Sequence, residues 1–103
     1  MVVRVLIATV PATKAGRFHE YMRAQLPMLR EREGLRYVKL ARRVEGEKEK
    51  VMLYEEWRDT DALYAWAGPE ITKPRLLPGA WELLDEITVD HYEALDIVPV
   101  PDD

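Results

Sequence analysis

Two tryptophans that lie nine residues apart are the first candidates for a site that binds an aromatic molecule. Trp57 follows two consecutive glutamates, and Trp66 comes just before a Gly-Pro sequence. Large aromatic side chains beside an irregular loop can form the wall of a small-molecule pocket. Both can also be ordinary core residues. That interpretation is stronger for Trp57, because only Trp66 adjoins the segment that is most able to open.

Three further side chains can hold a proton or an anion. His91 lies in phase with Ile87 and Val89, so it is either a base that reaches a cavity or a half-buried core histidine. His19 is expected on the solvated face of a helix. Arg75 lies in a proline-rich segment, where it can meet an anionic group of a ligand or remain a surface arginine.

Composition excludes several classes of site. The chain has no cysteine and no serine, which excludes disulfides, thiolate metal sites and both cysteine and serine nucleophiles. It also has no glycine-rich phosphate-binding loop. His91 and Glu93 have a two-residue spacing, but two ligands are too few for a metal site, so we expect no metal.

Charge and hydropathy limit the partners. The net charge of −4 argues against a nucleic-acid partner. The basic stretch 36–43 is expected to face the acidic segment 82–103, within the chain or across a dimer. No apolar run is long enough to span a membrane, and residues 1–11 are more typical of a strand than of a signal peptide, so we expect a cytoplasmic protein. Many charged residues, one glutamine and no asparagine suggest a thermophilic source.

The spacing of apolar residues predicts the elements that must position these side chains. Strands are predicted over 2–10, 35–44, 51–57 and 83–95, and helices over 13–33 and 62–67. Thr13 is the expected N-cap of the first helix, Pro27 is expected to kink or loosen it, and Gly34 to end it. Residues 59–61 are expected to cap the second helix, and 68–82 to form a loop with at most a broken helical turn.

The order of these elements is that of an α+β, ferredoxin-like β-α-β-β-α-β fold, in which a four-stranded antiparallel sheet carries both helices on one face. Both faces of the first strand are apolar, with Val3, Val5 and Ile7 on one side and Leu6, Ala8 and Val10 on the other. Since the helices cover only one face of the sheet, a second copy of the chain is the simplest cover for the other. We therefore predict a homodimer of single domains over 1–95, with 96–103 as a tail that is frayed or extended along a neighbour.

The run VMLYEEWRDTDALYAW, residues 51–66, resembles the antibiotic biosynthesis monooxygenase family. The hallmark of that family is a strand that ends in Glu-x-Trp, followed by a capped helix with an aromatic residue or histidine near its end. EGLRYVKLARRV is similar to the family's second strand, and the resemblance covers residues 2–95. It implies a homodimer of ferredoxin-like domains. The family includes cofactor-free oxygenases of polyketide quinols and the related haem-degrading monooxygenases.

The resemblance also bears on single residues. Trp66 falls where the tryptophan-bearing members have their second-helix tryptophan, which in haem-degrading members lies against the porphyrin. In those members a histidine about ten residues further on ligates the iron, but here that stretch reads ITKPRLLPG and has no histidine. The family's asparagine near the end of the first strand is also missing, since Ile7, Ala8 and Thr9 occupy that region. These departures argue against haem degradation.

We therefore predict a cofactor-independent monooxygenase that acts on a quinol or polycyclic phenol. Its expected catalytic residues are Trp66, which would stack on the ring, and His91, which would favour the anion of the substrate. The expected substrate contacts are Trp57, Tyr64, Arg75 and Thr9. Two alternatives remain open: a non-catalytic dimer that binds a small aromatic ligand, and a haem-binding protein that uses one of its two histidines.

Overall fold

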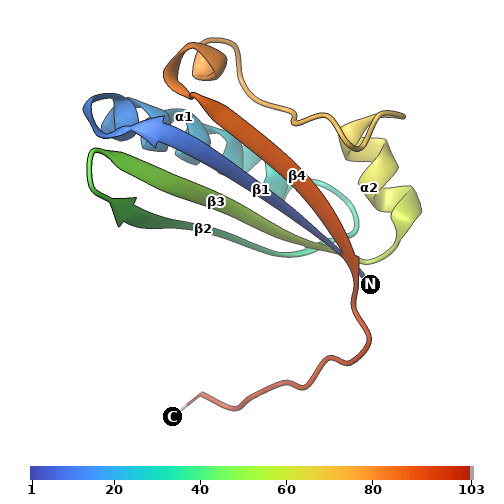
Figure 1. Ribbon diagram of the computed structural model, residues 1–103. Coiled ribbons are helices and arrows are strands. Elements are labelled where there is room, and N and C mark those ends of the chain that lie inside the picture. Colours follow the sequence, from blue (N-terminus) through green and yellow to red (C-terminus); the bar gives the residue numbers. More distant parts are fainter. Residues whose placement is uncertain (103) are drawn as a thin grey trace.

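One four-stranded sheet carries both helices on a single face (Figure 1). The computed structural model describes residues 1–102. Its elements are β1 (Val2–Pro11), α1 (Ala12–Arg30), β2 (Leu35–Glu45), β3 (Lys48–Trp57), α2 (Thr60–Ala67), the 3-10 turn η1 (Ala80–Leu83) and β4 (Glu86–Glu93). Neighbouring strands are antiparallel in the order β2-β3-β1-β4, which confirms the predicted α+β ferredoxin-like fold. None of the helices in residues 1–102 is long and apolar enough to cross a membrane.

The start of α1 corrects the predicted cap. Thr13 lies inside the first turn of the helix, and Pro11 stands at the N-cap without a side-chain hydrogen bond. The amide of Ala12 instead donates to the carbonyl oxygen of Glu47 at 2.8 Å. The turn between β2 and β3 therefore satisfies a free amide of the helix start, which a capping side chain would otherwise do.

The end of α1 also lies earlier than predicted. The helix runs through Pro27 and ends at Arg30, and not at residue 33. Pro27 cannot donate a backbone hydrogen bond, so the helix ends within about one turn of it. A short turn follows, in which Gly34 at φ 88° leads the chain into β2.

The remaining elements and connections differ from the prediction by a few residues. β3 begins at Lys48, and not at residue 51, because a two-residue turn with Gly46 at φ 61° joins it to β2. The Oδ1 of Asp59 accepts a hydrogen bond from the amide of Ala62 at 2.9 Å, which confirms the predicted cap of α2. The predicted loop contains one helical turn, η1, so β4 is shorter than the expected 83–95.

The two apolar faces of β1 lie in different surroundings. Leu6, Ala8 and Val10 are buried beneath the helices, whereas Val3, Val5 and Ile7 lie half-buried on the open face of the sheet. The neighbours of the open-face residues on β3 include Met52 and Tyr54. The predicted division of apolar residues between the two faces is thus confirmed. The second copy of the chain that it predicts stays a prediction.

Beyond β4 the chain runs away from the sheet as an extended, largely exposed tail (Figure 1). The basic stretch on β2 does not face it within the chain, so this part of the prediction is wrong. Arg42 pairs with Glu49 and Arg43 with Glu45, both on the same hairpin, because these acids are nearer than the C-terminal ones. A contact across a dimer stays a prediction.

Candidate functional site

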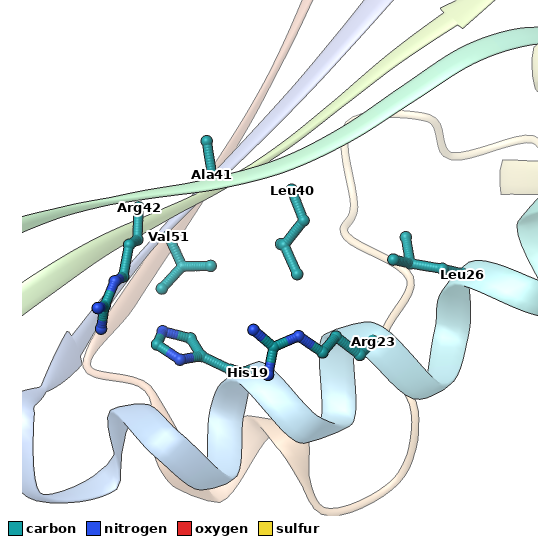
Figure 2. A pocket seen from close by; sticks show the side chains of 7 residues that line it. All are labelled: His19, Arg23, Leu26, Leu40, Ala41, Arg42 and Val51. Atoms are coloured by element: carbon teal, nitrogen blue, oxygen red, sulfur yellow. The ribbon is translucent and has the colours of Figure 1, made fainter.

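A cavity of about 450 Å³ lies between α1 and the edge strand β2 (Figure 2). Its lining residues are His19, Arg23, Leu26, Leu40, Ala41, Arg42 and Val51. Its volume is in the range of small-molecule sites. Leu26, Leu40 and Val51 form an apolar wall, and the polar groups come from both the helix and the hairpin.

The register of two elements opens this cavity. His19, Arg23 and Leu26 have i, i+4, i+7 spacing, so they share one face of α1, next to the stripe that is buried against the sheet. Leu40 and Arg42 point from β2 toward this helix face (Figure 2). β2 is an edge strand, and three consecutive residues of its second half, Arg42, Arg43 and Val44, are exposed, so α1 leaves a gap there.

A histidine, a buried carboxylate and an arginine meet in the cavity. The Nε2 of His19 lies 2.9 Å from Oε1 of Glu49, and the Nη1 of Arg42 donates to Oε2 of the same carboxylate at 3.2 Å. Glu49 is 6% exposed, and the side chain of His19 is 13% exposed. The expectation of a solvated His19 is therefore wrong, because Glu49 draws the imidazole inward.

This arrangement can accept a proton from a bound ligand. A carboxylate that holds one nitrogen of an imidazole fixes the orientation of the ring and leaves the other nitrogen to meet a proton. Arg23 forms no ion pair or side-chain hydrogen bond with residues 1–102, and its guanidinium projects beside the imidazole toward β2 (Figure 2). The cavity thus combines an oriented base, a free cation and an apolar wall.

A second polar cluster lies inside the core. His91 on β4 and Glu55 on β3 are the two register neighbours of Arg4 on β1, and Arg4 and Glu55 are both 1% exposed. The Nη1 of Arg4 lies 3.0 Å from Nε2 of His91, and Oε1 of Glu55 accepts a hydrogen bond from Nε1 of Trp57 at 2.9 Å. The row His91–Arg4–Glu55–Trp57 thus connects His91 to Trp57, two residues that the sequence predicts for the site.

Burial shifts the ionisation of this row. Desolvation raises the pKa of Glu55 and lowers the pKa of Arg4. The pKa of His91 is lowered, first by burial and then by the positive charge of Arg4. His91 is therefore held neutral, with Nε2 available as an acceptor for Arg4.

The loop that follows α2 is held by hydrogen bonds to its main chain. Arg4 donates from Nη1 to the carbonyl oxygen of Ile71 at 2.6 Å and from Nη2 to that of Lys73 at 3.1 Å. Gln25 on α1 donates to the carbonyl oxygen of Arg75 at 2.8 Å. Alternate carbonyl groups of this stretch thus point inward and are satisfied by buried side chains.

Trp66 lies beneath this loop. Its side chain is 2% exposed, and the guanidinium carbons of Arg75 and Arg32 lie 4.4 Å and 4.9 Å from its ring centroid. Arg75 also donates to the carbonyl oxygen of Trp66. A cavity of about 420 Å³ beside the loop is lined by Arg75, Leu76 and Trp81 among others, but not by Trp66.

The predicted site residues therefore fall into separate groups. Trp66 and Arg75 are in contact, and His91 is linked to Trp57 through the buried row. Tyr64 is largely exposed on α2, and Thr9 lies in phase with the open-face residues of β1, on the side of the sheet opposite the helices. Neither joins the other predicted residues.

The sequence contains a signal for each of these buried polar residues. Arg4 is in phase with the buried residues of β1, and Glu49 and Glu55 are in phase with Val51 and Leu53 on the inner face of β3. A charged residue in the apolar phase of a strand indicates a buried, paired charge. The signal of Glu49 is weaker, because it lies in the highly charged stretch 46–50, which is also typical of a turn.

Comparison with known proteins agrees with the fold. The sequence profile described as antibiotic biosynthesis monooxygenase matches residues 1–71. No curated protein sequence matches the chain. A candidate antibiotic biosynthesis monooxygenase from Deinococcus radiodurans is similar in structure, with a TM-score of 0.73 and 14% identity over 99% of this chain and 100% of that one.

Two proteins of Mycobacterium tuberculosis are also similar in structure. Rv0793 has a TM-score of 0.71 and 20% identity, over 96% of this chain and 100% of that one. The haem-degrader MhuD, solved with two haems in its active site, has a TM-score of 0.70 and 23% identity over the same shares. At these identities the likeness concerns the fold, whereas the profile match covers most of the sequence. The chain therefore belongs to the antibiotic biosynthesis monooxygenase family.

Proposed function

We propose that this protein is a cofactor-independent monooxygenase that oxidises a quinol or polycyclic phenol in the cavity between α1 and β2. The observation that carries the proposal is the imidazole of His19, which lines a cavity with one apolar wall and has its Nε2 2.9 Å from the buried carboxylate of Glu49. Family membership supports the reaction class.

The proposed reaction begins with proton transfer from the substrate hydroxyl to His19. The resulting phenolate is electron-rich enough to give one electron to dioxygen, and the radical pair then combines to form a carbon–oxygen bond. Loss of water from the peroxide leaves a carbonyl group, so that one phenol and one dioxygen yield one quinone and one water. The substrate itself supplies all four electrons, so no other reductant is needed.

The surrounding residues have distinct roles in this proposal. The apolar wall of Leu26, Leu40 and Val51 keeps water from the radical pair. Arg23 supplies the free positive charge of the cavity, which holds an anionic substrate beside His19. Glu49 acts through His19 as a positioning residue, and its second oxygen is held by Arg42.

The loop that covers Trp66 is the competing location for the reaction. Trp66 and His91 would then be the catalytic residues, and Arg75 a substrate contact. This location requires the loop to move, because Trp66 is almost completely buried and Arg75 already lies against its ring. The cavity beside His19 needs no such movement.

We propose that the protein works as a homodimer. The half-buried Val3, Val5 and Ile7 on the open face of the sheet support this assembly, since a solvated face would carry polar residues at these alternate positions. A small domain also gains burial by self-association.

Haem is a less suitable ligand for these side chains. MhuD is a haem-degrader, but both imidazoles of this chain already use Nε2 within the protein: that of His19 lies against Glu49 and that of His91 against Arg4. Neither histidine offers this nitrogen to an iron. Titration with haem is expected to give no Soret band typical of histidine ligation.

Oxygen uptake with a panel of hydroquinones and polycyclic phenols tests the proposed reaction. The wild-type protein is expected to consume oxygen with at least one of them, and His19→Gln to lower the rate by about 10²-fold or more. Glutamine keeps a hydrogen bond to Glu49, so this variant is expected to fold normally. Trp66→Phe and His91→Gln serve as matched variants for the competing location.

Three outcomes distinguish the alternatives. A loss of rate in His19→Gln alone supports the reaction in the cavity. A loss in Trp66→Phe or His91→Gln, with His19→Gln unaffected, moves the reaction to the loop and contradicts the proposed location. Binding of the phenols without oxygen uptake above a protein-free control contradicts the monooxygenase and favours a non-catalytic binding protein.

A further inference from the structure

We infer that the ligand of the cavity between α1 and β2 is an aromatic acid, a phenol or quinol that also carries a carboxylate, which Arg23 binds. This inference deepens the proposed function and rests on it for the phenol. It begins with the charges of the cavity. Glu49 accepts from both His19 and Arg42, so its negative charge is already shared, whereas Arg23 has no carboxylate partner within residues 1–102.

The position of Arg23 sets how far the positive charge lies from the imidazole of His19. Arg23 follows His19 by four residues on α1, and side chains with this spacing start about 5–6 Å apart on the helix surface. The Arg23 side chain runs along the helix toward His19, so that its guanidinium lies beside the imidazole (Figure 2). A ligand whose hydroxyl meets the imidazole therefore places a second substituent of the same ring near the guanidinium.

The wall of the cavity favours a flat apolar body between these two groups. Leu26, Leu40 and Val51 offer only apolar side-chain atoms, and Ala41 points to the other face of the sheet (Figure 2). An aromatic ring buries its faces against such a wall without leaving polar groups unpaired. A sugar or an amino acid would bury polar groups there without partners.

The number of free guanidinium groups favours a carboxylate over a phosphate. A single arginine binds a carboxylate through two parallel hydrogen bonds, and one positive charge matches one negative charge. Arg42 is the other guanidinium in the cavity, but it is committed to Glu49. A dianionic phosphate would have only one free cation to meet it.

Calorimetric titration with 2,5-dihydroxybenzoate and with its methyl ester tests the inference. The two probes share the quinol, and the ester replaces the carboxylate by a neutral group that is larger by one methyl. We expect the wild-type protein to bind the acid about tenfold more tightly than the ester. Arg23→Gln is expected to remove this preference, with a much smaller loss of affinity for the ester than for the acid. Arg17→Gln is the matched control, because Arg17 is exposed on the same helix, as Arg23 is, but does not line the cavity.

The outcomes separate this inference from the proposed function. Tighter binding of the acid that depends on Arg23, without oxygen uptake, supports the ligand class and contradicts the monooxygenase. Equal affinity for acid and ester, or an unchanged preference in Arg23→Gln, overturns the inference even where oxygen is consumed. Failure of both probes to bind overturns it as well.

Discussion

Arg4 on β1 and Glu55 on β3 lie opposite each other in the sheet, with Nε of Arg4 3.9 Å from Oε1 of Glu55 and both residues 1% exposed. A buried ion pair repays the cost of its desolvation only when further hydrogen bonds satisfy both partners. Arg4 obtains them at its two Nη atoms from the carbonyl oxygens of Ile71 and Lys73, and Glu55 from the indole of Trp57, whereas Nε of Arg4 has only the ion pair within residues 1–102. The pair therefore joins the sheet to the loop after α2.

Replacing Arg4 by leucine is expected to lower the free energy of unfolding by about 3–5 kcal/mol. The change leaves Glu55 buried without a cation and removes the donors for two loop carbonyls. Urea denaturation measures the effect. Arg4→Leu combined with Glu55→Gln is expected to recover part of the loss, because glutamine is neutral and still accepts from Trp57. A double variant no more stable than Arg4→Leu alone would contradict the coupling.

Stability is expected to depend on pH through His91. Its native pKa lies below the ordinary value of 6.5, so the unfolded chain binds more protons in the window between the two. The contribution of neutral His91 is therefore complete above this window and is lost as the pH falls through it. The raised pKa of Glu55 acts in the opposite direction, since its stabilising proton is lost as the pH rises.

The difference between wild type and His91→Gln isolates this contribution. Glutamine accepts from Arg4 without titrating, so its advantage over histidine is expected to grow as the pH is lowered from 7 to 5. Thermal unfolding at each pH gives the comparison, in which the contribution of Glu55 is shared by both proteins. A constant difference across this range would show that His91 does not titrate differently in the folded state.

Two glycine substitutions are expected to have opposite effects. Gly34 adopts φ 88°, and a Cβ at this position would collide with the Cβ of Ala62 on α2. Gly34→Ala is expected to cost about 1–2 kcal/mol from the backbone conformation alone, and more from the collision. Gly16 lies inside α1 with open space around it, so Gly16→Ala is expected to stabilise by about 0.5–1 kcal/mol. Urea midpoints measure both, and equal effects would contradict the close approach of β2 and α2.

A charge on the open face of the sheet is expected to break the proposed dimer. Val5 lies in the middle of this face, opposite Tyr54, so Val5→Lys would bury an unpaired ammonium group between two copies. We expect light scattering at micromolar concentration to give a dimer for the wild type and a monomer for the variant. Ala24→Lys, on the exposed side of α1, is expected to remain dimeric. A monomeric wild-type protein would overturn the assembly.

The alternation of residues predicted the fold well, because each helix and strand is set by local spacing. The same spacing contained Arg4 and Glu55 in the buried phase, but it could not name their partners. Arg4 bonds to main-chain carbonyl groups, which every residue has and no sequence pattern marks. The burial of His19 could not be predicted for a related reason. Its partner Glu49 lies on another element, β3, and the helical spacing alone does not indicate that the two side chains meet.

The hydrogen bonds to alternate carbonyl groups after α2 also bear on how this loop can diverge among related proteins. Ile71 and Leu76 pack against the core, but the course of the stretch between them is set by donors on β1 and α1. Substitutions within the loop leave those donors in place. Relatives that keep Arg4 and Gln25 are thus able to change the chemistry of the loop surface while the backbone follows the same path.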